Sequence, residues 1–278
     1  MNELPLILFG VLSQAAAGLA LVLALLPLVL RDRAADLAGA TRLAGRLVFP
    51  FAVLAVLASF FHLGDPLGGF RALSHVGGSW MSNEVVLAAL FTAVAAALFC
   101  LHQWQPASAG AIRAATWATA LVGLVLVFAT GMIYQLPTRP EWYHWSNLLA
   151  GYVTALLLGA LLMALLALWK AEAPASAARL LGAVALAGAG LLAVSLIFYA
   201  PYLTGVSAVT AEAVFGNLLF WARLAVGIGL PVYTAAQMAR GQQPGRAVLS
   251  LALVVAFAGE IVARGIFYTS VLDQVPFF

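Results

Sequence analysis

The chain is a succession of long apolar segments separated by short polar connections. Runs of about 18 or more apolar residues recur along the whole sequence, and each is long enough to cross a hydrocarbon core of about 30 Å. The runs are rich in Leu, Ala and Val and lack the two-residue alternation of a membrane β-strand. Because only helices and closed barrels satisfy their backbone hydrogen bonds inside a bilayer, this pattern predicts an all-α integral membrane protein.

Composition agrees with this assignment. Hydrophobic residues make up 64% of the 278 residues and charged residues only 8%, whereas soluble domains are roughly half apolar and a quarter charged. No cleavable signal peptide is expected, because the first apolar run continues to Leu30 without a basic start or a cleavage site. We predict a single polytopic domain over residues 1–278, a bundle of eight transmembrane helices at roughly 5–30, 46–64, 84–101, 113–135, 147–170, 179–200, 216–239 and 246–270.

The basic residues indicate how the bundle is oriented. On one face, the loops between the predicted helices hold nine Lys and Arg residues: Arg31, Arg33, Arg42, Arg46, Arg113, Lys170, Arg179, Arg240 and Arg246. The loops on the other face hold only Arg71 and Arg139. Since cytoplasmic loops carry the excess of Lys and Arg, both termini are predicted on the outer face. The basic residues form no single patch, so a nucleic-acid partner is not expected.

One connection on the predicted outer face is unusually polar. The stretch FHLGDPLGGFRALSHVGGSWMSNE, residues 61–84, contains His62, Arg71, His75 and Glu84 between two strongly apolar runs. His62 ends the second predicted helix, where it either interacts with the helix dipole or accepts a proton near neutral pH. Glu84 begins the third helix, where it is either a carboxylate favoured by the dipole or a functional group at membrane depth. A quinol headgroup would lie at this depth and must lose two protons when it is oxidised.

Three charges fall inside the last two predicted helices. Glu260 and Arg264 are four residues apart in the eighth helix, so we predict that they form a structural ion pair on one face. Arg223, in the seventh helix, has no acidic neighbour in sequence and needs a partner from another helix.

A tightly bound metal or haem is not expected. The single cysteine, Cys100, cannot hold an iron–sulfur cluster, which needs about four thiolates. A haem of the b type commonly needs two histidines that face each other across helices. The four histidines lie near the ends of the predicted spans, and only His62 and His144 remain a geometrically possible pair.

Two motifs resemble those of a known family, the membrane anchor subunits of dimethyl sulfoxide reductase (DmsC). The first is an HLG-x-P-x-x-x-F segment followed by L-x-x-V-G-x-S-x-x-S-N-E. The second is a late GE-x-x-x-RG-x-FY. Here they comprise His62–Gly64, Pro66, Phe70, Leu73, Val76–Gly77, Ser79 and Ser82–Glu84, then Gly259–Glu260, Arg264–Gly265 and Phe267–Tyr268. Chain length, the number of helices and the placement of the motifs agree as well.

The resemblance implies a non-catalytic anchor subunit without a redox centre of its own, located in a bacterial cytoplasmic membrane. Such anchors oxidise menaquinol and hold an iron–sulfur subunit and a molybdopterin catalytic subunit on the outer face. The resemblance assigns quinol binding to His62 and Glu84. Arg71 and His75 would shape the pocket or contact the iron–sulfur partner.

Two other functions are compatible with the residues. The first is a haem b-containing cytochrome subunit that oxidises quinol. The second is a proton-coupled transporter in which Glu84, Arg223, Glu260 and Arg264 form an ion path, although these charges do not obviously meet at the midplane of broken helices.

Overall fold

The computed structural model describes residues 3–61, 71, 73–172 and 174–272, without the side chains of residues 32–34 and 272. In these ranges the chain forms helices and turns and no strand. The helices are α1 (Leu4–Leu30), the 3-10 helix η1 (Arg31–Leu37), α2 (Ala38–Phe60), α3 (Trp80–Trp104), α4 (Ala109–Met132), α5 (Trp145–Trp169), α6 (Ala175–Val206), α7 (Ala208–Phe215), α8 (Leu218–Ala222), the π-helix η3 (Arg223–Ile228), α9 (Gly229–Ala239) and α10 (Arg246–Leu272).

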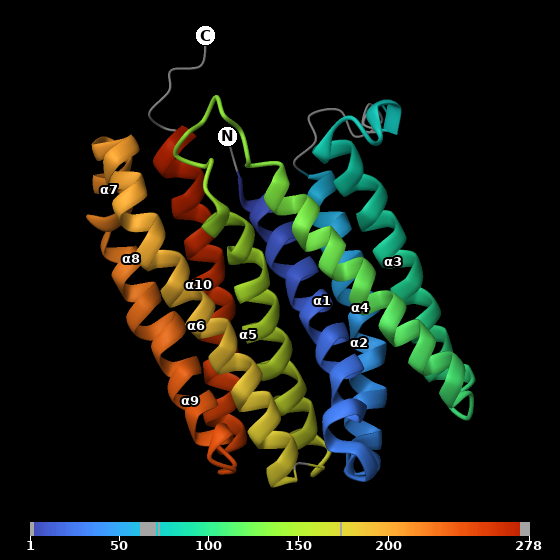
Figure 1. The fold of residues 1–278 in the computed structure, drawn as a ribbon. Helices are drawn as coiled ribbons and strands as arrows, with labels where there is room; N and C mark the ends of the chain where they lie inside the picture. The colour runs from blue at the N-terminus through green and yellow to red at the C-terminus, as the bar shows by residue number, and fades with distance from the viewer. Residues whose placement is uncertain (1–2, 62–70, 72, 173, 273–278) are drawn as a thin grey trace.

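Eight helical segments in the described part of the chain are long and apolar enough to cross a membrane. They run side by side in one bundle, and the start of α1 and the end of α10 lie at the same end of it (Figure 1). We call this the Glu84 end and the opposite end the Arg113 end. The prediction of an eight-helix, all-α membrane protein is confirmed.

The seventh span is not a continuous α-helix. Residues 218–239 comprise α8, the π-helical segment η3 and α9. A π-helical turn accommodates an extra residue and is frequent at functional sites. Arg223 is the first residue of this segment.

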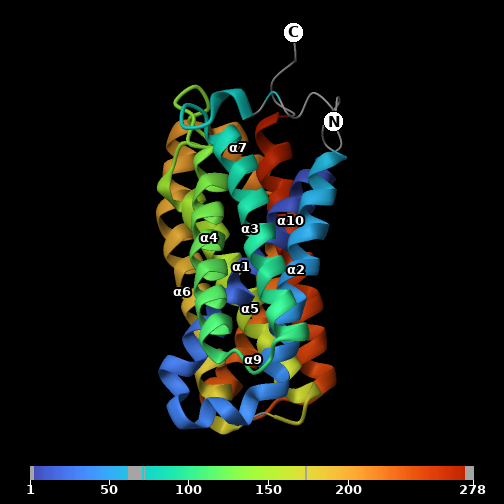
Figure 2. The ribbon, with the colours of Figure 1, turned by 90° about the vertical axis from the view of Figure 1, so that its right-hand side faces the viewer.

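Two helices, α1 and α5, form the centre of the bundle. In their most apolar windows 72% and 67% of the residues are buried, whereas the other spans have 28–33%. Helix α1 packs against α2, α4 and α5, and α5 packs against α6 and α10. Helices α3 and α4 form an outer layer over α1, as the view from their side shows (Figure 2).

The contact between α1 and α5 is made by backbone atoms. A Cβ on Gly18 would overlap with the carbonyl group of Ala155, and one on Gly159 would overlap with the carbonyl carbon of Gly18. Small residues allow membrane helices to approach this closely, because dispersion contacts replace the hydrophobic driving force of water. The two glycines therefore set the distance between the central helices.

A side chain at Gly159 should separate these helices. We expect Gly159→Val to lower the thermal midpoint of the detergent-solubilised chain or to prevent its recovery as a monodisperse species, since overpacking typically costs about 1–3 kcal/mol and more at backbone contacts. Gly190→Val in α6 is the matched control, because a Cβ there meets nothing within 4 Å. Equal melting curves for the two variants would contradict the role given to this contact.

Candidate functional site

The structure describes three of the four residues predicted to bind quinol. Arg71 and His75 are exposed in the segment that precedes α3, and His75 Nδ1 lies 2.8 Å from the Ser74 hydroxyl. Glu84 lies on α3, one turn after its first residue, Trp80. His62 lies outside the described residues.

The Glu84 carboxyl group points into the bundle although α3 is a peripheral helix. Its oxygen Oε1 is buried and has no hydrogen-bond partner among the described residues. Thr130 of α4 lies near the carboxyl group, but its hydroxyl donates to the Leu126 carbonyl at 3.0 Å. The carboxyl group also acts electrostatically on Tyr134 and Tyr268. A buried carboxyl oxygen without a partner is costly, so this atom is available to a ligand, a water molecule or a proton.

The two tyrosines on which the Glu84 charge acts are hydrogen-bonded to each other. The hydroxyl groups of Tyr134, which follows α4, and Tyr268, on α10, are 2.8 Å apart. Burial raises the pKa of the Tyr134 phenol well above its ordinary value, and Tyr268 adds to the rise, so Tyr134 keeps its proton at neutral pH. Because only one of the two hydroxyl protons is used between them, the pair retains a proton that it can donate to another acceptor.

The connection between α4 and α5 fixes this pair in place. Trp142 donates from its ring nitrogen to the Phe267 carbonyl at 3.2 Å, and the two rings stack with centroids 5.4 Å apart. Tyr199 of α6 donates to the Glu141 carbonyl at 2.8 Å. The connection is thereby attached to both α6 and α10, and Tyr134 packs edge-on against Trp142 and Phe267.

A small cavity lies beside the tyrosine pair at the Glu84 end. It is lined by residues of α1, α4, α5 and α10, among them Gln14, Thr130, Asn147 and Arg264. Its volume of about 10 Å³ is enough for one water molecule. A quinol ring therefore does not fit inside this cavity as the side chains stand, but a water molecule that carries protons does.

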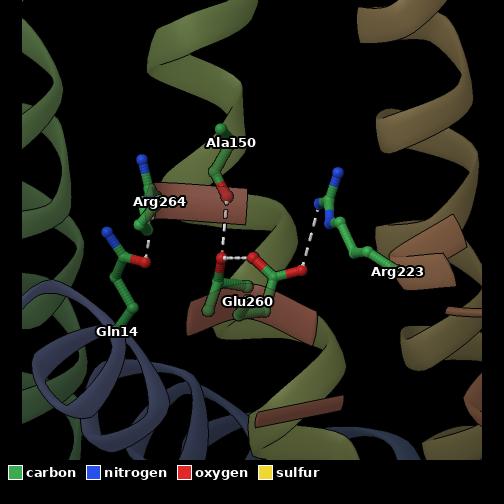
Figure 3. A network of polar contacts seen from close by, with 6 residues as sticks. Gln14, Ala150, Arg223, Glu260 and Arg264 are labelled. Atoms are coloured by element: carbon green, nitrogen blue, oxygen red, sulfur yellow. Dashed lines mark hydrogen bonds and ion pairs between the residues drawn. The ribbon is translucent and has the colours of Figure 1, made fainter. Parts of the chain in front are cut away.

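Glu260 and Arg264 do not form the ion pair predicted from their spacing. Glu260 binds Arg223 instead, with Oε1 3.2 Å from Nη2, and Arg264 donates to Gln14 of α1 at 3.1 Å. Figure 3 shows Arg223 and Arg264 on opposite sides of Glu260. The predicted pairing was wrong because the carboxylate turns toward η3, where Gly227 and Gly259 allow the two backbones to approach. The expectation that Arg223 has its partner on another helix is confirmed.

The Glu260 carboxylate is satisfied on both oxygens. Thr154 of α5 lies 2.6 Å from Oε2 and also contacts the Ala150 carbonyl (Figure 3). The side chains of Arg223 and Glu260 are only 8% and 3% exposed. The pair connects η3, α10 and α5 inside the bundle, at a position where charges are stable only when they are paired.

A second cavity, of about 110 Å³, adjoins this ion pair. Arg223 Nε and the Ser195 hydroxyl are buried side-chain atoms of its walls that lack a partner in the described part of the chain. Asn147, Arg264 and Phe267 line both cavities, so the two are separated by a wall of side chains from α5 and α10. No group of three or more His, Cys, Asp or Glu side chains that could hold a metal ion occurs among the described residues.

Removing one member of the buried ion pair should be strongly destabilising. We expect Arg223→Met to lower the free energy of unfolding by about 3–5 kcal/mol, because it leaves Glu260 charged and unpaired. The double variant Arg223→Met with Glu260→Met should recover a large part of that loss. Lys170→Met is the control, since Lys170 is exposed at the end of α5. A single variant Arg223→Met within about 1 kcal/mol of the native chain, measured by denaturant titration in micelles, would contradict the pairing.

Comparison with known proteins places the chain in a family. The sequence model of the family described as DMSO reductase anchor subunit (DmsC) matches residues 1–270. The chain is 28% identical over 276 residues to the C chain of the anaerobic dimethyl sulfoxide reductase of Escherichia coli strain K12, a match that covers 96% of this chain and 94% of that protein. A Haemophilus influenzae protein with the same name is 30% identical over 165 residues, or 57% of this chain and 56% of that protein. Because the family match extends over nearly the whole sequence, the chain belongs to the DMSO reductase anchor subunits.

Proposed function

We propose that the chain anchors a reductase complex of the dimethyl sulfoxide type in the bacterial cytoplasmic membrane and oxidises menaquinol there. Electrons pass to an iron–sulfur partner subunit, which supplies a molybdopterin catalytic subunit. Support for the anchor role comes from the family match and from the eight membrane spans. The relatives are themselves named as chains of anaerobic dimethyl sulfoxide reductase.

The observation that carries the quinol site is the buried, unpartnered carboxyl oxygen of Glu84. Trp80 lies one turn earlier on the same face of α3, and its ring meets Phe128 of α4 edge-on with centroids 5.7 Å apart. These two side chains are 40% and 39% exposed. A quinol that arrives through the bilayer therefore finds an aromatic surface for its ring within one helical turn of a proton acceptor.

The reaction releases two electrons and two protons from each quinol. A quinol hydroxyl donates to Glu84 Oε1, and the donor proton retained by the Tyr134–Tyr268 pair orients the carboxylate. The water-sized cavity is lined by both tyrosines and not by Glu84, so a proton that leaves the carboxyl group reaches it through the tyrosine pair. With the Glu84 end on the outer face, as the basic loops predict, both protons and both electrons leave on the same side of the membrane.

The polar segment before α3 completes the site in this proposal. His62 accepts the other quinol proton, because a neutral imidazole is a suitable base near neutral pH. Arg71 and His75 are exposed, which suits contact with the iron–sulfur partner that docks on the outer face.

Exchanging Glu84 for glutamine should impair quinol oxidation specifically. Because an amide cannot accept the proton, we expect quinol-dependent reduction by the Glu84→Gln complex to fall about 100-fold or more. Reduction with a water-soluble dye that feeds the iron–sulfur subunit directly should not change. Glu212→Gln is the matched control, since Glu212 is an exposed carboxylate on α7. Native quinol turnover in the Glu84 variant would exclude this role.

A second substitution tests the histidine. His62→Arg places a fixed positive charge where the proposal needs a base, so quinol-dependent reduction should be lost while the complex still assembles. Assembly is measured by co-purification of the three subunits, and turnover by oxidation of a menaquinol analogue. A variant that assembles and turns over quinol at the native rate would rule out His62 as the proton acceptor.

A further inference from the structure

A third cavity lies at the Arg113 end, far from Glu84. It has a volume of about 330 Å³ and is lined by residues of α1, α2, α3 and α4. At this end the hairpin of α3 and α4 leans away from α1 and α2 (Figure 1). The cavity therefore occupies the wedge between this hairpin and the central helix.

The polar residues of the wall are Thr41, His102, Arg113 and Thr116, and Arg113 is the one among them with a fixed charge. His102 is only 8% exposed, and its ring has no hydrogen-bond partner among the described residues although it borders the cavity. Arg113 lines the cavity as well. Arg42 and Arg46 act electrostatically on His102, and Arg46 donates to the His102 carbonyl at 3.1 Å while its Nε is buried without a partner in the described chain.

No carboxylate offsets these charges at the cavity. Its lining, within the described residues, contains neither Asp nor Glu. Glu172, at the same end of the bundle, is already bound to the backbone N–H groups of Gly39 and Ala40. The first turn of α4 also borders the cavity, and the positive end of a helix dipole favours an anion.

The remainder of the wall is apolar. Its larger side chains are Leu23, Leu26 and Leu28 of α1 and Ile112 and Trp117 of α4. Of these, Leu28 is 60% exposed on the outside of the bundle. An occupant thus needs an anionic group for the basic wall and a hydrocarbon chain for the rest, and basic pockets between membrane helices bind phospholipid headgroups of this kind.

We propose that this cavity binds one anionic phospholipid, with its phosphate held by Arg113 and His102 and supported by Arg46, and with an acyl chain along α1 and α4. The lipid fills the wedge and connects the α3–α4 hairpin to α1. This site is separate from the quinol site and does not depend on it, because it uses none of the same residues.

Lipid titration of the purified full-length chain in neutral detergent tests the proposal. The chain is titrated with phosphatidylglycerol or with phosphatidylcholine, and native mass spectrometry counts the lipid molecules that it retains. Inorganic phosphate is added separately as a competitor. We expect one phosphatidylglycerol to be retained in preference to phosphatidylcholine, and Arg113→Gln to weaken its binding about fivefold. Arg113→Lys should restore most of the binding, whereas Lys170→Gln, which removes an exposed charge at the same end, should leave it unchanged.

Three results would overturn the proposal. Equal retention of phosphatidylglycerol and phosphatidylcholine would show that the basic wall does not select the lipid. Displacement of the lipid by inorganic phosphate alone would show that the acyl chain contributes nothing. Equal weakening by Arg113→Gln and Lys170→Gln would show that only the overall charge of this end matters. If Arg113→Gln fails to fold, the competition between the two lipids on the native chain still tests whether the cavity selects an anionic lipid.

Discussion

The backbone contact between α1 and α5 is the constraint on which the rest of the bundle depends. With Gly18 and Gly159 in direct contact with the opposite helix, no side chain separates the two central helices. The same closeness brings Gln14 of α1 next to Gly151 of α5, where a Cβ would lie 3.1 Å from the Gln14 amide nitrogen. Gln14 is then in position to accept from Arg264 of α10. The polar groups of the site are therefore held by a rigid apolar contact.

The charges inside the bundle follow two different arrangements. Arg223 and Glu260 neutralise each other at 3.2 Å, and such a pair connects helices without creating a net field. Arg264 has a neutral amide as its partner instead, and it acts electrostatically on Tyr134 and Tyr268, as Glu84 also does. The tyrosine pair is thus subject to opposite electrostatic effects from a cation and a carboxyl group. This arrangement suits a proton-transfer site, since a proton that binds to the carboxyl group removes its negative charge and so changes the electrostatic potential at the two tyrosines.

Hydropathy alone was sufficient to predict that eight segments span the membrane, because crossing a bilayer is a property of each segment by itself. It did not give all the bounds: the second span was predicted at roughly 46–64, whereas α2 is Ala38–Phe60 and includes Arg42 and Arg46, which were predicted in a loop. Glu84 could be singled out as a carboxylate within an apolar run. The partner of Glu260 could not be predicted, because an i,i+4 spacing describes only one helix. Its true partner, Arg223, lies on η3, and the approach of η3 to α10 depends on Gly227 and Gly259. Tyr134 and Tyr268 were missed as a pair because 134 residues separate them. Gln14 is a polar amide within the first apolar run, which indicates a buried polar contact, but its partner Arg264 is 250 residues away in the sequence.

The two ends of the α3–α4 hairpin hold different kinds of polar side chain. Glu84 and Thr130 lie near one end of the hairpin, and His102 and Arg113 lie near the other. The hairpin packs on α1 and α2 along its length but leans away from them at the Arg113 end (Figure 1). The lipid proposed for the wedge and the quinol proposed for the Glu84 end therefore use the same two helices at opposite ends, with no residue in common.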